Sequence, residues 1–234
     1  MREIRINPSS AGWAVGNQVI TEYSSGCLRH LLLKNYLPIP FNLPEDLIKV
    51  GADGEDKYQN YLDNEQEYPY HKECVMKSTM DGVTVSGRID FLSHHEKFRV
   101  VHECKSSKSK NLLYKVIRKG EVKLSHLAQL VFYLIHLNET RGKLIVWYEP
   151  TNETRVFKVV IGEGGEIFID GVRHTFDVAE QIQHQLLSAK VIKENILWDR
   201  PNGAACKYCD YNKICTKYDE SGLTFTEFME TNNV

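Results

Sequence analysis

Two β-rich segments, separated by a short polar stretch, restrict the fold of this chain most strongly. Val83 to Leu92 nearly alternates apolar and polar residues, and Phe98 to Lys105 is a second run of strand-forming residues. Ser93 to Lys97, between them, is polar and short enough for a turn. The pattern predicts an antiparallel hairpin whose successive side chains point to opposite faces of a sheet.

The rest of the chain predicts a mixed α/β fold, with a central mixed sheet flanked by helices. Leu124 to Leu137 is apolar almost all round, which is typical of a helix buried on most of its surface. Lys143 to Glu149 and Thr154 to Ile161 read as a second strand pair, and Glu166 to Ile169 as a short extra strand. From Arg173 to about Asn195 we expect a long helix.

The N-terminal part reads as helical. Turn residues at Asn7 to Ser10 precede a helical stretch that reaches roughly Asn35, and prolines then form a short linker. A second helix is expected from about Leu43 to Glu65, interrupted or kinked near Gly51 and Gly54.

A chain of 234 residues with 42% hydrophobic residues can bury one sizeable core. We expect a single domain with three parts: an N-terminal helical part (1–70), a catalytic sheet with a buried helix (71–170), and a C-terminal helix with a cysteine cluster (171–234). The N-terminus lacks a signal-peptide core, and the longest apolar stretch is too short to span a membrane. We therefore expect a cytoplasmic protein with no membrane partner.

Charge is distributed unevenly. The formal net charge is −2, yet seven basic residues and a single acid, Glu121, lie between Lys105 and Lys123. A local basic patch of this kind suits a polyanion such as DNA. The candidate phosphate contacts are Lys108, Lys110, Lys115, Arg118 and Lys119.

The hairpin carries the residues with the clearest chemistry. Glu103 and Lys105 share one face of their strand, and a turn near His95 to Lys97 brings Asp90 approximately across from Glu103. Two adjacent carboxylates need a cation between them, and hard oxygen ligands suit Mg²⁺ or Mn²⁺. Lys105 beside that metal would orient or activate a water, or stabilise charge on a phosphate. Taken alone, Glu-x-Lys also fits the wet face of an ordinary amphipathic strand.

Together these residues resemble a known family. Gly87-Arg88-Ile89-Asp90 followed by Glu103-Cys104-Lys105 looks like the core of the PD-(D/E)XK nuclease superfamily. Gln129 and Tyr133, four residues apart and so on one helix face, resemble the Gln-x-x-x-Tyr motif of its RecB-like branch. A satisfied core glutamine and a packing tyrosine would give the same pattern. The resemblance implies a restriction-endonuclease-like core, with Gln129 and Tyr133 supporting the catalytic site.

The RecB-like pattern also places Gly-x-x-x-His or Gly-x-x-x-Glu on an upstream helix as a further metal ligand. Gly51-Ala52-Asp53-Gly54-Glu55 fits this pattern, with Glu55 at the ligand position. Asp53 and Asp56 are close competitors for that role.

Four of the six cysteines have a suggestive spacing. Cys206, Cys209 and Cys215 lie near the C-terminus, and Cys27 lies far upstream. A three-plus-one split is better known from iron–sulfur coordination than from zinc sites, although structural Zn²⁺ stays open. The pattern resembles the [4Fe–4S] staple of AddB-type nucleases and of the CRISPR-associated Cas-four exonucleases, which would tie the N-terminal helical segment to the C-terminus.

The resemblance implies a Mg²⁺- or Mn²⁺-dependent DNA exonuclease that acts on single-stranded ends, with 5′-to-3′ polarity favoured. Its context would be CRISPR adaptation, and so antiviral defence, or DNA recombination and repair. The alternative is a partner-dependent DNA-end binding subunit that serves a CRISPR integrase complex and has little activity alone. A zinc-loaded, purely structural cysteine site remains the third possibility.

Overall fold

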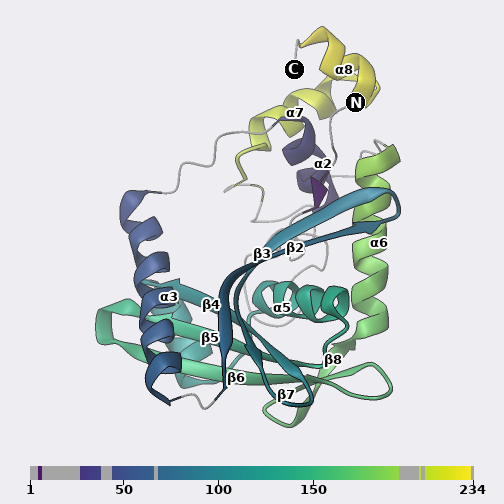
Figure 1. The fold of residues 1–234 in the computed structure, drawn as a ribbon. Helices are drawn as coiled ribbons and strands as arrows, with labels where there is room; N and C mark the ends of the chain where they lie inside the picture. The colour runs from purple at the N-terminus through teal and green to yellow at the C-terminus, as the bar shows by residue number, and fades with distance from the viewer. Residues whose placement is uncertain are drawn as a thin grey trace.

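The computed structural model describes residues 5–6, 27–37, 44–65, 68–194, 206 and 209–232, and Figure 1 shows their arrangement. The helices are α2 (Leu28–Tyr36), α3 (Glu45–Glu65), α4 (Lys110–Leu112), the π-helix η2 (Leu113–Arg118), α5 (Leu124–Leu137), the short 3-10 helix η3 (Glu149–Thr151), α6 (Val178–Glu194), α7 (Asn212–Ser221) and α8 (Phe225–Thr231). The strands are β1 (Arg5–Ile6), β2 (Tyr70–Met80), β3 (Val83–His94), β4 (Arg99–Ser107), β5 (Arg141–Tyr148), β6 (Glu153–Ile161), β7 (Glu166–Ile169) and β8 (Val172–Asp177). None of the described helices combines the length and apolar character that crossing a membrane requires.

The strands described form one eight-stranded sheet in the order β1-β3-β4-β5-β6-β7-β8, and β2 pairs with β3. β3 and β4 are antiparallel, with Phe91 opposite His102. The hairpin prediction is therefore confirmed, and His95 closes its turn by donating its N–H to the Phe98 carbonyl at 3.0 Å. β4 and β5 are parallel, which the intervening helix α5 allows by crossing from one end of the sheet to the other.

The sheet opens beside Asp90. One edge of β3 pairs with β2 along most of its length. The other edge is shared: β1 pairs with it at Thr84 and Val85, and β4 joins it only from Phe91 onward. Residues 86–90 of β3 lie between these two ladders. On this edge, β3 has no strand partner at Asp90 among the described strands.

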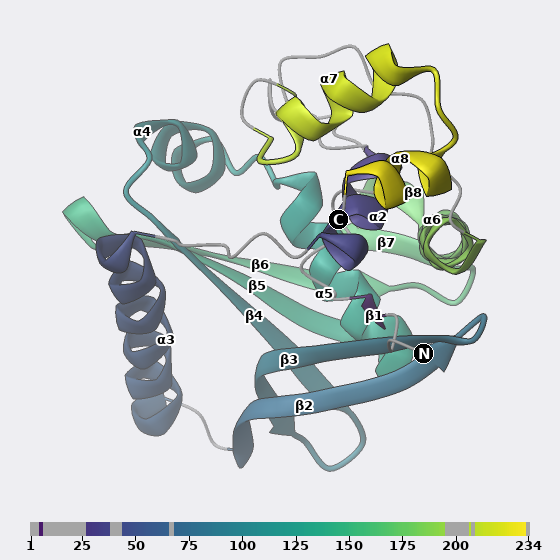
Figure 2. The ribbon, with the colours of Figure 1, turned by 90° about the horizontal axis from the view of Figure 1, so that it is seen from above.

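Helices cover both faces of the sheet. In Figure 2, α3 lies on one face, while α5 and α6 lie on the other. The main core is on the α5 side, where Leu127, Leu130 and Phe132 are buried with Leu144 and other strand residues. On the α3 side, a smaller cluster holds Tyr58, Leu62, Phe91 and Ile145. Burial of these apolar side chains fixes the position of each helix on the sheet.

A separate small core joins segments far apart in the chain. Leu32 and Leu33 of α2 pack with Val191 of α6, and with Phe225 and Phe228 of α8. Arg29 forms an ion pair with Asp219 of α7 at 2.6 Å. Figure 1 shows α2, α7 and α8 gathered at one end of the molecule.

The expected long helix from Arg173 begins later. Residues 172–177 form strand β8, so the sheet extends past the boundary predicted at residue 170. Asp170 and Gly171 have φ angles of +51° and +84°, a turn geometry that returns the chain onto β7. α6 then starts at Val178, where Asp177 accepts the Glu180 N–H at 2.8 Å and caps the helix.

Three further differences concern the N-terminal half. α3 runs without interruption through Gly51 and Gly54. Cys27 has an extended backbone, with φ −119° and ψ 93°, so a helix ending near Asn35 begins only after it; the rest of that predicted stretch lies outside the described residues. β2 was not predicted, because most of its residues are only partly buried or exposed and its sequence lacks an apolar alternation. β1 lies within the part expected to be helical.

Candidate active site

Asp90 and Glu103 meet at the opening of the sheet. The register of Phe91 with His102 places them at the next position of the ladder. There the Asp90 carboxylate takes the place of a backbone acceptor, since its Oδ2 receives the Cys104 N–H at 2.7 Å. Asp90 is 8% exposed and Glu103 is 1% exposed. Burial raises the pKa of Asp90, although Lys105 and the bond from Cys104 oppose this shift.

Glu103 is held by Lys105 from the same strand. The Lys105 ammonium donates a hydrogen bond to Glu103 Oε1, while Oε2 is buried without a partner. Burial raises the pKa of Glu103 to about 7, and the Asp90 and Glu55 carboxylates add to the shift against the effect of Lys105. Burial alone would lower the pKa of Lys105, but Glu103 and Asp90 outweigh it and raise that pKa. Lys105 therefore stays an ammonium ion.

Glu55 reaches the same site from helix α3. Burial raises its pKa, and the charge of Asp90 raises it further, which places the two carboxylates within electrostatic reach. Its competitors point elsewhere: Asp53 pairs with Lys49 at 2.6 Å, and Asp56 pairs with Lys72 at 3.1 Å. Of the three acids considered from the sequence, Glu55 is the one that interacts with both strand carboxylates: Asp90 raises the pKa of Glu55, and Glu55 raises the pKa of Glu103.

Sequence reasoning missed two charged residues beside this group. Glu73 on β2 raises the pKa of Asp90 and of Glu55, and it has a positive φ of 56° within a strand. Such a backbone conformation is uncommon for a residue with a side chain and is often found at functional sites. Arg88 binds Glu73 at 3.0 Å and lies 3.7 Å from Glu55. Arg88 stands within the quoted Gly-Arg-Ile-Asp motif, whereas nothing in the sequence marks Glu73.

Gln129 and Tyr133 face the site from α5. Tyr133 is 2% exposed and donates its hydroxyl to the Arg88 carbonyl at 2.7 Å. Burial raises the pKa of Tyr133, and the charges of Glu103 and Asp90 raise it further. Gln129 is buried and forms a side-chain hydrogen bond with Tyr133. The structure thus brings the predicted pair together with both strand carboxylates.

The donor set fits a divalent cation in its chemistry. Asp90 raises the pKa of Glu55, both of these carboxylates raise the pKa of Glu103, and a buried oxygen of Glu103 lacks a partner among the described residues. Oxygen ligands with excess negative charge suit Mg²⁺ or Mn²⁺. Within the described ranges, no three His, Cys, Asp or Glu side chains are close enough to form a complete set of metal ligands, and Lys105 occupies one Glu103 oxygen.

The basic segment follows directly after β4. Lys108, Lys110, Arg118 and Lys119 are exposed, and Lys115 is half-buried. Acidic partners lie near two of them: Asp46 is 3.8 Å from Lys108, and Glu153 is 3.2 Å from Arg118. Figure 2 shows α4 projecting from the body of the sheet, next to one end of α3.

The four cysteines with the suggestive spacing come together near α2 and α7. Electrostatic interactions link Cys27 to Cys206, Cys209 to both of these, and Cys215 to Cys27 and Cys209. Burial is the main cause of the raised pKa of Cys27, Cys209 and Cys215. All six cysteines are free thiols. Cys74 and Cys104 lie on β2 and β4 instead, and the described residues contain no complete metal-ligand group here either.

The fold and site together define a nuclease-like protein, with acidic residues and a lysine where two strands of a mixed sheet separate. Residues 44–216 match the sequence model of the PD-(D/E)XK nuclease superfamily. The chain belongs to this superfamily. No curated protein sequence matches it.

Solved structures share the fold at low sequence identity. The crystal structure of SSO0001 is 17% identical, with a TM-score of 0.55, and the match covers 92% of this chain and 87% of the other. An alkaline exonuclease from Laribacter hongkongensis is 11% identical with a TM-score of 0.57, over 82% and 89% of the two chains. A phage-related exonuclease from Haemophilus somnus is 8% identical with a TM-score of 0.50, over 83% and 98%.

Proposed function

We propose that this protein is a metal-dependent DNA exonuclease. The observation that carries the proposal is Glu103, a buried carboxylate with one oxygen bound by Lys105 and the other without a partner, next to Asp90. Asp90, Glu103 and Glu55 would hold one or two Mg²⁺ or Mn²⁺ ions. The bound cation would supply Lewis-acid stabilisation of charge on the phosphate and on the attacking water.

The chain's own residues would do the remaining work. Water loses a proton to the solvent and forms a new bond to phosphorus, the bond from phosphorus to one sugar oxygen breaks, and that oxygen takes up a proton from the solvent. Lys105, kept protonated by its carboxylate neighbours, would orient the water and stabilise negative charge on the phosphate. Tyr133, through its bond to the Arg88 carbonyl, would hold β3 and therefore Asp90 in position.

The substrate would be DNA with single-stranded ends, and we favour 5′-to-3′ polarity. The exposed lysines and arginine between residues 108 and 119 support phosphate contact, which would make binding strongly salt-dependent. The alkaline and phage-related exonucleases with this fold support exonuclease chemistry. One neighbouring crystal structure contains dAMP, in keeping with nucleotide binding by this fold.

We also propose that Cys27, Cys206, Cys209 and Cys215 hold a [4Fe–4S] cluster. Their mutual electrostatic interactions support this, because a cluster needs its four thiols close together. A structural Zn²⁺ is the alternative ligand of the same four thiols. Either would tie α2 to the C-terminal helices.

Digestion of single-stranded DNA labelled at either end tests the function. Wild type with Mg²⁺ or Mn²⁺ should shorten the strand progressively, and the labelled end that is lost first gives the polarity. Lys105→Ala should bind the same DNA but cut it at least about 100-fold more slowly. Lys97→Ala, in the exposed hairpin turn, should cut like wild type. Cutting by Lys105→Ala at the wild-type rate would reject the site.

A partner-dependent role in CRISPR adaptation is the second candidate. It is supported by the exposed basic segment, which would bind DNA ends whether or not the protein cuts them alone. DNA binding without cutting, together with pull-down of integrase subunits in the presence of DNA, would favour this role. Cutting by the isolated protein, with no association in any DNA-bound state, would reject it.

A further inference from the structure

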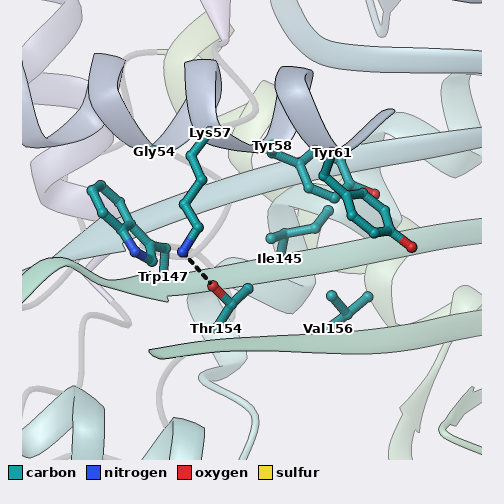
Figure 3. Close-up of a pocket in the computed structure, with 8 residues that line it drawn as sticks. All are labelled: Gly54, Lys57, Tyr58, Tyr61, Ile145, Trp147, Thr154 and Val156. Atoms are coloured by element: carbon teal, nitrogen blue, oxygen red, sulfur yellow. Dashed lines mark hydrogen bonds between the residues drawn. The ribbon is translucent and has the colours of Figure 1, made fainter. Parts of the chain in front are cut away.

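A cavity lies on the α3 face of the sheet, between α3 and strands β5 and β6. It has a volume of about 280 Å³, close to the lower end of small-ligand sites at roughly 300 Å³. Figure 3 shows Lys57 descending from α3 across the cavity, with Trp147 on one side and Tyr58 and Tyr61 on the other. Thr154 and Val156 form the wall on β6.

Aromatic faces dominate this cavity. Tyr61 is 52% exposed, and it stacks on Tyr58 with ring centroids 5.6 Å apart and an interplanar angle of 19°. The Trp147 indole is fixed by a hydrogen bond from Nε1 to Asn152 Oδ1 at 3.1 Å. Flat rings that are partly exposed and held in place are the platforms on which nucleic-acid bases stack.

Lys57 adds a positive charge that has no acidic partner in the part of the chain that the structure describes. Within the described residues, its contacts are the carbonyl and side-chain oxygens of Asn152, the Thr154 hydroxyl at 3.3 Å, and the face of Trp147 at 5.2 Å. By contrast, Lys49, Lys72 and Lys108 around α3 each pair with an aspartate. A cation that is bound only by neutral oxygens can accept an anion such as a phosphate without displacing a carboxylate.

Residues that line the cavity are neighbours of the proposed catalytic residues along the chain and across the sheet. Gly54 lines it, and the next residue is Glu55. Trp147 is paired in register with Ser106, which follows Lys105. A strand bound at the catalytic carboxylates could therefore continue past this end of β4 into the cavity.

We propose that this cavity binds one nucleotide of the DNA strand, with its base stacked on Tyr61 and its phosphate on Lys57. The inference rests on the proposed function for the identity of the strand. A free mononucleotide offers the same base and phosphate, so the experiment separates the two sources.

Binding without metal tests the inference independently of cutting. Fluorescein-labelled oligothymidylate is titrated with full-length protein in chelator, and anisotropy gives the affinity. Lys57→Gln and Tyr61→Ala should each weaken binding by at least about five-fold. Lys97→Gln and Tyr68→Ala serve as matched controls outside the cavity and should bind like wild type. Thermal unfolding of each variant should confirm that it is folded.

Two further titrations identify the bound group. An abasic strand of the same length should bind wild type more weakly, and Tyr61→Ala should cause no additional loss with it. Thymidine monophosphate as competitor should displace the labelled strand if the cavity takes free nucleotides, and should fail to do so if it takes strands only. Wild-type affinity in both cavity variants would overturn the inference. If the cavity variants weaken binding but wild type never cuts DNA, the cavity inference would stand and the exonuclease proposal would be rejected.

Discussion

The Tyr133 hydroxyl donates a 2.7 Å hydrogen bond to the backbone carbonyl of Arg88, two residues before Asp90. This contact ties the buried helix α5 to β3 within residues 86–90, where β3 lies between its ladders with β1 and β4. We therefore propose that Tyr133, the tyrosine of the Gln-x-x-x-Tyr motif, is a positioning residue that acts on the site through the backbone.

Tyr133→Phe tests this relationship. Loss of the hydroxyl leaves a carbonyl without its partner, so the free energy of unfolding should fall by about 1 kcal/mol. Because Asp90 is no longer fixed, cutting should slow by about an order of magnitude. Denaturant unfolding and single-turnover digestion measure the two effects, and Tyr114→Phe, an exposed tyrosine, is the control. Full activity with lowered stability would assign Tyr133 a packing role only.

The raised pKa of Glu103 predicts a pH-dependent stability difference. Its pKa is about 7 in the folded protein, against an ordinary value of 4.5. The stabilising contribution of the neutral acid is complete below pH 4.5 and is lost as pH rises through 7, because the folded state then must bury a charge. In chelator, Glu103→Gln should therefore gain stability relative to wild type, by on the order of 2 kcal/mol, between pH 4.5 and 8. The same stability difference between Glu103→Gln and wild type at every pH in that range would contradict the raised pKa.

Gly51 and Gly54 form a matched pair on helix α3. A Cβ at Gly54 would lie 1.9 Å from Ser106 Oγ and 2.9 Å from Trp147, whereas a Cβ at Gly51 meets nothing within 4 Å. Gly51→Ala should stabilise the protein by up to about 1 kcal/mol through helix propensity. Gly54→Ala should destabilise it by about 1–3 kcal/mol, because the helix must move away from the sheet. Equal effects of the two substitutions, measured by urea unfolding, would mean that α3 does not pack this closely.

Metal content tests the cysteine site. Anaerobically purified wild type should contain iron and acid-labile sulfide, and Cys27→Ser and Cys215→Ser should lose both. Cys74→Ser should keep them, since Cys74 lies on β2, away from the four clustered thiols. Stoichiometric zinc without iron, by elemental analysis, would reject the cluster and establish the alternative.

Sequence patterns predicted the elements that have a clear pattern of apolar residues. The bounds of α5 and β7 agree with the predicted ranges, because an all-apolar helix and a short alternating strand have distinct periodicities. β8 was mistaken for helix because its residues, Val172 to Asp177, lead directly into α6. The turn at Asp170 and Gly171 is the feature that separates β8 from helix-like continuity and pairs it with β7.

The part of the candidate site that lies on the hairpin could be predicted from the spacing of its residues. Asp90, Glu103 and Lys105 follow from the register of two local strands. Glu73 could not be found this way, because its position depends on the pairing of β2 with β3 and on an unusual backbone angle. The motif pattern pointed to Gly51, yet Gly54 is the position where a side chain would clash. This clash could not be predicted, because it depends on how closely α3 approaches Ser106.

The small core of α2, α7 and α8 has a consequence for the order of events during synthesis. Arg29 and Asp219 are separated by 190 positions, so contacts across this core close one of the longest loops in the chain. The hairpins of the central sheet join neighbouring segments and can form while the ribosome is still at work. α2 must wait until Phe225 and Phe228 have emerged from the exit tunnel. Any metal bound by the four cysteines would accordingly be inserted late, beside the core of α2, α7 and α8, when the hairpins of the central sheet can already have formed.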